Sequence, residues 1–338
     1  MKLPTRLPVL ADSAAIEQAA LLLREGRLVA FPTETVYGLG ADARNPAAVQ
    51  RIFAAKGRPA DHPLIVHLSN VAHLDEWAIN IPDNAIKLAA HFWPGPLAII
   101  LNKQPTVPVE VTGGQETVAL RVPNHPVALQ LLQAFGGGVA APSANRFCRI
   151  SPTQALHVAE ELGDTVDLIL DGGACTVGVE STIVDLSTER PRLLRPGHIS
   201  YLQIEAVLNT ALLLPPSLKP THTASASAVR APGMMAVHYA PSTLALRYRA
   251  EQLPVLLREL TASHKKAGLL TYREAIPENP ITQVIQLSNH ADAYAQALYA
   301  SLRQLDQLQL DIILVEQPPE SEAWRAVNDR LSKATRAY

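Results

Sequence analysis

Residues 56–67 read KGRPADHPLIVH, a basic turn that leads directly into a short apolar run. The run at 64–66 is bounded by a proline and by polar residues, which is typical of a buried strand. The turn carries Lys56, Arg58 and His62, and arginine and lysine are the side chains that bind phosphate best. Loops at strand ends often hold ligands in α/β proteins. The stretch therefore predicts an α/β fold with an anion-binding loop, although a solvated basic turn explains the same residues when they are taken alone.

The composition is that of a globular protein with room for two domains. The chain has 338 residues, of which 48% are hydrophobic and 18% are charged, and this length exceeds what one small core needs. A net charge of −2 provides no overall field for nucleic acid, so any anion site must be local. Two cysteines are too few for a disulfide framework, and the N-terminal residues lack a signal-peptide core. We expect reduced thiols and a cytoplasmic protein.

The apolar pattern up to about residue 210 predicts helices and strands in mixed order. Helices are expected at 13–25, 46–56, 83–92, 126–135, 153–162 and 202–208. Strands are expected at 28–31, 64–68, 97–101, 118–122, 139–141, 168–170, 183–185 and 192–194. Because strands outnumber helices and the connections vary in length, we expect an α/β fold with a twisted, mixed sheet.

The chain changes character after this region. Residues 212–231 mix proline with small polar residues and show no period, as linkers do. Beyond this stretch, strands are expected at 244–248, 267–270 and 311–315, and helices at 253–260, 291–305 and 322–332. We therefore predict a first domain at 1–211, an interdomain linker and lid at 212–241, and a smaller three-layer, Rossmann-like α/β domain at 242–338.

The common motifs of nucleotide and metal chemistry are missing. The sequence has no Gly-x4-Gly-Lys-Ser/Thr loop, no His-Glu-x-x-His and no paired cysteines, and Gly38-Leu39-Gly40 does not extend into a dinucleotide fingerprint. A Ser-His-Asp triad stays open, because its members need not be close in sequence, but there is no nucleophile elbow. The chemistry is therefore expected in polar loops at strand ends.

Two of these loops suit an amino acid. The loop 32–39 follows a strand and contains Thr33-Glu34-Thr35, which can bind an amine and a carboxylate, although a capping turn explains it equally well. Strand alternation places Thr117 and Arg121 on one face. A buried arginine is costly without an anionic partner, and that partner is either a ligand, which we favour, or a carboxylate that the sequence does not identify.

Further polar loops lie at 141–145, 178–182 and 194–197, and each is weak by itself because turns are generally polar. Taken together, the loops place Arg58, Arg121 and Arg195 at strand boundaries in a slightly negative chain. A local concentration of positive charge of this kind suits a small polyanion such as a nucleoside triphosphate.

These motifs together resemble a known family. Lys56-x-Arg58, Ser143-x-Asn145, the loop 32–39 and the segment 178–182 resemble the Sua5/YrdC/YciO family over residues 12 to about 210. The segment 234–241 ends in His-Tyr-Ala-Pro and resembles the interdomain signature of the longer, Sua5-type members. The resemblance implies a YrdC-like twisted mixed sheet followed by a C-terminal Sua5 domain.

The resemblance also implies an activity. Family members include threonylcarbamoyl-adenylate synthases, nucleotidyltransferases that convert L-threonine, bicarbonate and ATP into threonylcarbamoyl-AMP and pyrophosphate. The product supplies the t6A modification of tRNA, so the downstream partner would be the tRNA threonylcarbamoyltransferase machinery. Mg²⁺ would arrive with ATP, no protein metal site is expected, and neither a membrane nor a stable nucleic-acid complex is implied.

The site residues follow from matching the family's motifs. Threonine-binding positions match Thr35, His67, Arg121, Ala141 and Ser181. ATP-binding positions match Arg58, His62, Thr117, Ser143, Ser151, Arg195 and Tyr239. The set implied as catalytic is Lys56, Arg58, Ser143 and Asn145.

The sequence departs from the family pattern at three places. His62 stands where the family usually has asparagine, a bulky segment at 146–149 replaces a short Ser-Gly loop, and the residues at 235–237 are less basic than usual. Histidine can still donate a hydrogen bond, with some pH dependence. These changes affect the expected lid contacts more than the reaction.

Three other functions remain open. An RNA-binding protein of the same fold would bind with steep salt dependence, but the low net charge and the 5% of aromatic residues argue against it. A hydrogenase-type carbamoyl-transfer enzyme would need zinc-finger and acylphosphatase segments for which this chain has no room. A sensor that binds threonine and nucleotide without turnover is the third alternative.

Overall fold

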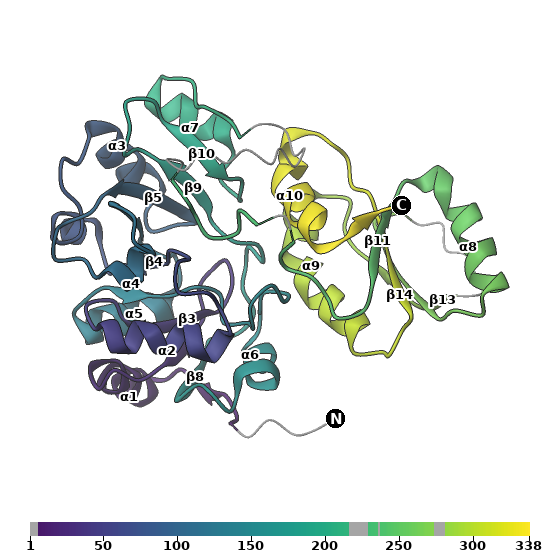
Figure 1. Cartoon of the computed structure of the whole chain (residues 1–338), viewed down its shortest axis with the longest axis horizontal. Helices are drawn as coiled ribbons and strands as arrows, with labels where there is room; N and C mark the ends of the chain where they lie inside the picture. Colours follow the sequence, from purple (N-terminus) through teal and green to yellow (C-terminus); the bar gives the residue numbers. More distant parts are fainter. Residues whose placement is uncertain (1–5, 216–228, 236, 274–280) are drawn as a thin grey trace. The chain divides into compact units, whose positions relative to one another are not determined.

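The computed structural model describes residues 6–215, 229–235, 237–273 and 281–338. The chain divides into two compact units (Figure 1). The first comprises residues 1–147, 152–176 and 180–234, and the second comprises 148–151, 177–179 and 235–338. Most of the expected linker at 212–231 falls on residues 216–228, outside the described residues, so the lid stays a prediction.

A mixed sheet of ten strands forms the first unit, in the order β1-β8-β2-β3-β7-β4-β6-β5-β9-β10. The strands are β1 (Val9–Leu10), β2 (Val29–Phe31), β3 (Gly38–Asp42), β4 (Ile65–His67), β5 (Leu97–Asn102), β6 (Thr117–Arg121), β7 (Val139–Ala140), β8 (Leu168–Asp171), β9 (Thr182–Asp185) and β10 (Arg192–Arg195). The helices are α1 (Ser13–Arg24), α2 (Pro46–Lys56), η1 (Val71–Glu76), α3 (Asp83–Phe92), α4 (Val109–Thr112), α5 (Pro126–Phe135), α6 (Ala155–Leu162) and α7 (Tyr201–Leu208). β4 pairs with β6 in parallel and with β7 antiparallel, which confirms the mixed α/β fold.

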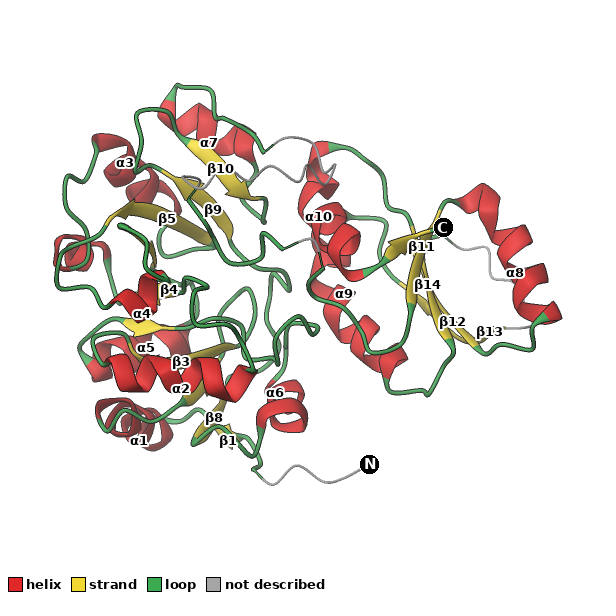
Figure 2. Cartoon of the chain, in the orientation of Figure 1, coloured by secondary structure: helices red, strands yellow, loops and turns green. Residues whose placement is uncertain are grey.

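The two faces of this sheet are covered differently (Figure 2). Helices α2, α3, α6 and α7 pack into the large core on one face, and α1 and α5 pack against β2, β7 and β8 on the other. The rest of that second face carries a small cluster formed by Ile65, Ala98, Ile100, Ala119 and Ile183. Within the described part of the chain, this cluster includes residues 229 and 231 but no helix. We call the part of the sheet formed by these residues of β4, β5, β6 and β9 the open half-face.

Local signals in the sequence fix the helix that leads into the basic loop. The side chain of Asn45 accepts hydrogen bonds from the backbone N–H groups of Ala47 and Ala48, and Pro46 occupies the first turn. Gly57 ends the helix in the left-handed conformation, with a φ of 62°. The predicted boundaries of α2 are therefore confirmed, and Lys56 is its last residue.

The strand β3 was not predicted, because Gly38–Asp42 lies partly in the loop expected at 32–39. β3 pairs antiparallel with β2 and with β7. A Cβ at Gly40 would lie 2.8 Å from Cε1 of Phe31 and 2.9 Å from Cγ1 of Val139. The strand needs glycine for close packing, and the glycines conceal its β pattern.

The second unit contains a parallel sheet of five strands in the order β13-β12-β14-β11-β15. Its elements are β11 (Ala245–Tyr248), η2 (Ala250–Gln252), α8 (Leu253–Ala262), β12 (Ala267–Thr271), β13 (Ile281–Gln286), α9 (Ala291–Asp306), β14 (Ile312–Glu316), η3 (Glu322–Trp324), α10 (Arg325–Ala334) and β15 (Arg336–Ala337). Leu269 of β12 shares a cluster with α8, whereas a Cβ at Gly268 would meet Leu305 of α9. The two helices therefore cover opposite faces, which confirms the three-layer arrangement.

None of the helices among the described residues is long and apolar enough to cross a membrane.

Candidate active site

Arg121 projects from the open half-face at the end of β6. Ala119 of the same strand belongs to the open half-face, while Val118 and Leu120 belong to the core on the opposite side. This alternation confirms that Thr117, Ala119 and Arg121 share one face. The register of the parallel pair places His67 of β4 opposite Arg121.

The guanidinium of Arg121 is held on three sides. Its Nε donates to the carbonyl oxygen of Gly95 at 3.2 Å, and its Nη1 donates to Oγ1 of Thr35 at 3.0 Å. Its Nη2 lies 2.7 Å from Oε1 of Glu34, and both side chains are at most 5% exposed. Glu34 is thus the carboxylate that the sequence left unidentified. The buried charge of Arg121 therefore does not by itself require a ligand, and the binding of a ligand by Arg121 stays a prediction.

The same place nevertheless holds several unsatisfied polar atoms. Both carboxylate oxygens of Glu34, Nη2 of Arg121 and Nδ1 of His67 are buried and have no hydrogen-bond partner among the described residues. The contact between Glu34 and Arg121 is close enough for an ion pair but is not aligned as a hydrogen bond. A buried polar atom left without a partner costs about 1–3 kcal/mol. This concentration is typical of a site that a polar ligand completes.

Burial sets the protonation of the neighbouring groups. Burial and the adjacent charge of Arg121 lower the pKa of His67 to about 3, so its imidazole is neutral. Burial also lowers the pKa of His125 and, together with the charge of Glu34, raises the pKa of Cys175 to about 12. A buried, protonated thiol is not a nucleophile. Cys175 is therefore not a candidate nucleophile.

Lys56 holds the loop that carries Ser143 and Asn145. Its Nζ donates to the carbonyl oxygen of Ser143 at 2.5 Å and to the carbonyl oxygen of Asn145. The backbone N–H of Ala144 donates to the carbonyl oxygen of Tyr37 at 2.8 Å. The structure thus brings Lys56, the segment 143–145 and the loop 32–39 together. The grouping of these motifs in the sequence predicted this.

Arg58 and His62 form the other side of the basic loop. Nη2 of Arg58 donates to the carbonyl oxygen of Pro63 at 3.0 Å. The half-buried ring of His62 lies edge-on to Phe147, with ring centroids 5.4 Å apart. Burial and the charge of Arg58 lower the pKa of His62. This side of the site therefore carries its permanent positive charge on Arg58.

Thr117 begins β6, four residues before Arg121. A strand rises about 3.3 Å per residue, so the two side chains lie roughly 13 Å apart on the same face. Thr117 stands two residues before Ala119, which pairs with Ile65 at the start of β4. The basic loop that contains Arg58 leads into this end of β4. Arg58 and Thr117, which are matched to ATP, thus lie toward one end of this strand pair, and His67 and Arg121, which are matched to threonine, lie toward the other end.

Arg195 and Ser181 form a second buried pair. Nε of Arg195 donates to the carbonyl oxygen of Ser181 at 2.9 Å, and Nη2 donates to its Oγ at 3.0 Å. The next residue, Thr182, donates its backbone N–H to the carbonyl oxygen of Pro96 at 2.9 Å. Pro96 follows Gly95, whose carbonyl holds Arg121. The two arginines are therefore connected through a short path of backbone contacts.

Of the remaining predicted residues, Ala141 lies beside β4, and Ser151 and Tyr239 lie in the other unit. Ala141 follows β7, and its backbone N–H donates to the carbonyl oxygen of Ile65 at 3.0 Å. Ser151 and Tyr239 belong to the second unit. There Tyr239 is buried and stacks on Tyr299 with ring centroids 5.9 Å apart. The ATP contacts of Ser151 and Tyr239 stay predictions.

Sequence reasoning missed the pairing of Glu34 with Arg121. Glu34 lies in the Thr33-Glu34-Thr35 stretch of the loop 32–39, so the sequence shows the carboxylate. Its pairing with a residue 87 positions away follows only from the fold. The described residues contain no group of three or more His, Cys, Asp or Glu side chains placed to hold a metal ion.

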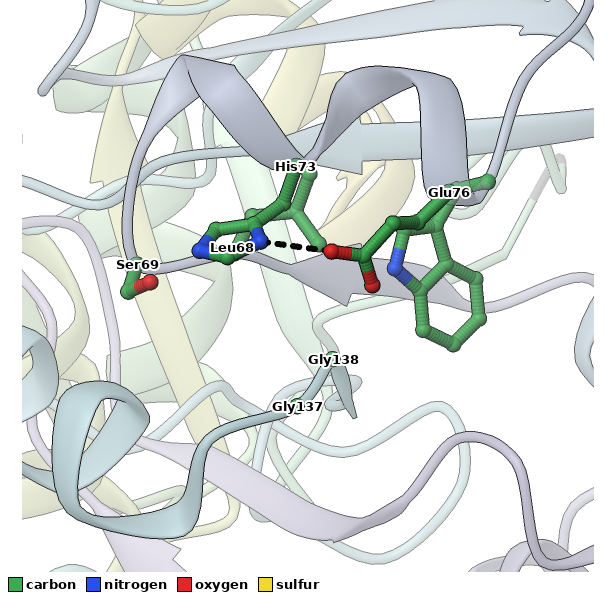
Figure 3. A pocket seen from close by; sticks show the side chains of 7 residues that line it. Leu68, Ser69, His73, Glu76, Gly137 and Gly138 are labelled. Carbon is green, nitrogen blue, oxygen red and sulfur yellow. Dashed lines mark hydrogen bonds and ion pairs between the residues drawn. The ribbon is translucent and has the colours of Figure 1, made fainter.

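A separate small pocket lies near the end of β4 (Figure 3). Its lining is formed by Leu68, Ser69, His73, Glu76, Trp77, Gly137 and Gly138. Nδ1 of His73 lies 2.7 Å from Oε1 of Glu76, and these side chains are 41% and 48% exposed. None of the residues predicted for the site lines this pocket, so we do not assign it to the active site.

Comparison with known proteins agrees with this arrangement. Residues 21–197 match the Sua5/YciO/YrdC family model, which is described as "Telomere recombination", and residues 199–335 match the model described as "Threonylcarbamoyl-AMP synthase, C-terminal domain". The chain belongs to the Sua5/YciO/YrdC family. It is therefore a member of the longer type, in which the family domain is followed by a Sua5 C-terminal domain.

Individual relatives match over nearly the whole chain. A protein of Pyrococcus abyssi named threonylcarbamoyl-AMP synthase is 42% identical over 322 residues, which are 95% of this chain and 94% of the relative. A Bacillus subtilis protein of the same name is 41% identical over 324 residues, which are 94% and 92% of the two chains. The crystal structure of P. abyssi Sua5 complexed with L-threonine matches with a TM-score of 0.88 and 40% identity, covering 96% of each chain.

Proposed function

We propose that this Sua5-type protein is a threonylcarbamoyl-AMP synthase, a nucleotidyltransferase that uses L-threonine, bicarbonate and ATP. The observation that carries the proposal is the buried Glu34–Arg121 pair with its unsatisfied polar atoms, set on the half of the sheet face that carries the small apolar cluster. The likeness to P. abyssi Sua5 in complex with L-threonine supports threonine as the amino acid. The names of the relatives support the synthase activity.

The chemistry needs binding and charge neutralisation rather than a covalent nucleophile. The amine of threonine reacts with bicarbonate to form a carbamate and releases water. A carbamate oxygen then attacks the α-phosphorus of ATP, and pyrophosphate leaves. Positioning the two reactants and stabilising the developing charge accounts for rate enhancement of this kind.

The residues of this chain divide into two roles in that scheme. Arg121, Thr35 and Ser181 bind threonine, and Arg58 and Arg195 neutralise the phosphates of ATP. Lys56 keeps Ser143 and Asn145 in place through its two carbonyl contacts. Thr117 and the basic loop lie at one end of β4 and β6, and His67 and Arg121 lie at the other. Because Arg195 also donates directly to Ser181, the amine and the α-phosphate would meet over the open half-face.

Mg²⁺ would enter with ATP, with phosphates and water as most of its ligands. The product would be consumed by the tRNA threonylcarbamoyltransferase machinery that forms t6A. A mixed anhydride of this kind is labile in water, so transfer must follow soon after synthesis.

The test is release of pyrophosphate by the full chain with Mg²⁺ and ATP. We expect release only when threonine and bicarbonate are both present. Equal release without threonine would replace the proposal with a plain nucleotidase. Threonine and ATP binding without release would favour the sensor. RNA binding whose affinity falls steeply with salt would favour the RNA-binding protein.

A further inference from the structure

Glu34 combines a central position in the site with two unsatisfied oxygens. Its side chain is 5% exposed, and neither Oε1 nor Oε2 has a hydrogen-bond donor among the described residues. We propose that Glu34 accepts the α-ammonium group of the amino acid substrate, while Arg121 binds its carboxylate, so that the pair selects a zwitterion. This inference rests on the proposed function, because it assumes that the amino acid binds beside Arg121.

The backbone around Glu34 is held by its neighbours. Oγ1 of Thr33 accepts the backbone N–H groups of Thr35 and Val36, both at 3.2 Å, and donates to the carbonyl oxygen of Val36 at 2.7 Å. Oγ1 of Thr33 also lies 2.8 Å from Oγ1 of Thr35, which accepts from Arg121. The turn therefore fixes the backbone from which the Glu34 side chain projects, and a group on an ordered backbone loses less entropy on binding.

The charges of the site favour a zwitterion. Glu34 and Arg121 carry one negative and one positive charge, and their side chains are at most 5% exposed. A ligand with one carboxylate and one ammonium completes an arrangement of four charges that sums to zero. A ligand with the carboxylate alone leaves one buried negative charge in excess, which is costly. His67 is neutral because burial and Arg121 lower its pKa, so it does not compensate that charge.

A purely supporting role for Glu34 explains the geometry less well. Arg121 already donates Nε to Gly95 and Nη1 to Thr35, so its plane is fixed without Glu34. The contact between Glu34 and Nη2 is close but is not aligned as a hydrogen bond. A carboxylate that only oriented Arg121 would be expected to face it as a bidentate pair. Instead Oε2 has no hydrogen-bond donor among the described residues, and an ammonium group carries three N–H donors.

The experiment compares two ligands by calorimetric titration of the full chain. L-threonine carries the ammonium group, and (R)-3-hydroxybutanoate has the same carboxylate and hydroxyl without it. We expect the wild-type protein to bind L-threonine at least tenfold more tightly. We expect Glu34→Gln to lower threonine affinity by about ten- to a hundredfold and to leave the affinity for (R)-3-hydroxybutanoate unchanged or higher. The exposed carboxylate variant Glu17→Gln should match the wild type.

The outcomes separate the possible roles. An equal loss of affinity for both ligands in Glu34→Gln would overturn the proposal, because both ligands carry the carboxylate that Arg121 binds. Equal affinity of the wild type for the two ligands would overturn it without any variant, even if Glu34→Gln does not fold. A wild type that binds neither ligand would instead contradict the proposed function, since the site would then take no threonine.

Discussion

Lys56 Nζ lies 2.5 Å from the carbonyl oxygen of Ser143, and the same ammonium donates to the carbonyl oxygen of Asn145. Three residues of the implied catalytic set are therefore joined by one buried cation. Hydrogen bonds from charged donors are roughly twice as strong as neutral ones. The ammonium group fixes the loop that presents the Ser143 hydroxyl and the Asn145 amide, so we interpret Lys56 as a positioning residue.

Lys56→Met tests this positioning role, because it keeps the length of the side chain and removes the donors. Two buried carbonyl groups lose a charged partner, and we expect the free energy of unfolding to fall by roughly 2–4 kcal/mol. Pyrophosphate release should fall with it. The measurement is chemical denaturation together with the release assay. Lys87→Met in α3 removes an exposed lysine and should change neither. Unchanged stability in Lys56→Met would contradict the positioning role.

Arg121→Lys should weaken threonine binding by about ten- to a hundredfold, the effect of losing a contact worth roughly 1.5–3 kcal/mol. Lysine keeps the positive charge beside Glu34 but loses the fork that reaches Gly95 and Thr35. Arg121→Ala is a poorer probe, because it leaves the buried Glu34 carboxylate without a counter-charge. Calorimetric titration with threonine and with ATP measures the effect. Normal threonine binding in Arg121→Lys would show that the amino acid lies elsewhere.

Arg58→Ala should produce the opposite pattern of binding. Arg58 is expected to contact phosphate, so its removal should lower the affinity for ATP by about ten- to a hundredfold. The affinity for threonine should stay within a factor of about two or three. Because Arg58 is buried and also donates Nη2 to the carbonyl oxygen of Pro63 at 3.0 Å, chemical denaturation checks that the variant folds. The same two titrations measure it. Loss of threonine affinity in Arg58→Ala would mean that the two halves of the site are not separate.

Sequence patterns predicted most elements whose signals are local. The cap at Asn45 and the stop at Gly57 determine α2 from neighbouring residues, and the apolar alternation in β6 is likewise local. β13 was missed because three of its six residues, Thr282, Gln283 and Gln286, are polar. It is an edge strand, and none of its residues is buried. The role of Glu34 was missed for a different reason. Its partner is 87 residues away, and only the register of the sheet brings the two together.

Asp306 contacts the segment 148–151 and the start of the second unit's main segment, so a substitution of Asp306 tests how this unit holds 148–151. Its Oδ2 accepts from Nη2 of Arg149 and from the backbone N–H of Ser242, both at 2.9 Å, and its Oδ1 accepts from the N–H of Thr243 at 2.7 Å. Asp306→Asn removes the charge and places a donor where one acceptor stood. We expect the free energy of unfolding of this unit to fall by roughly 1.5–3 kcal/mol. Chemical denaturation measures the free energy of unfolding, and limited proteolysis measures cleavage around Arg149. Equal stability and equal cleavage would show that the ion pair does not hold the segment.

The lowered pKa of His67 predicts how the free energy of unfolding depends on pH. Its pKa is about 3 in the folded protein and about 6.5 in an unfolded chain. Between these values the unfolded state binds more protons, so the contribution of neutral His67 is complete above pH 6.5 and is lost as the pH falls below it. From pH 7 to pH 5 this loss is about 2 kcal/mol, since each pH unit contributes up to roughly 1.4 kcal/mol. His67→Gln should flatten the fall in unfolding free energy by that amount, whereas His91→Gln, at an exposed position of α3, should leave it as in the wild type. Chemical denaturation of the three proteins at both pH values measures this, and identical pH dependence in His67→Gln and the wild type would show that His67 is not the buried neutral group.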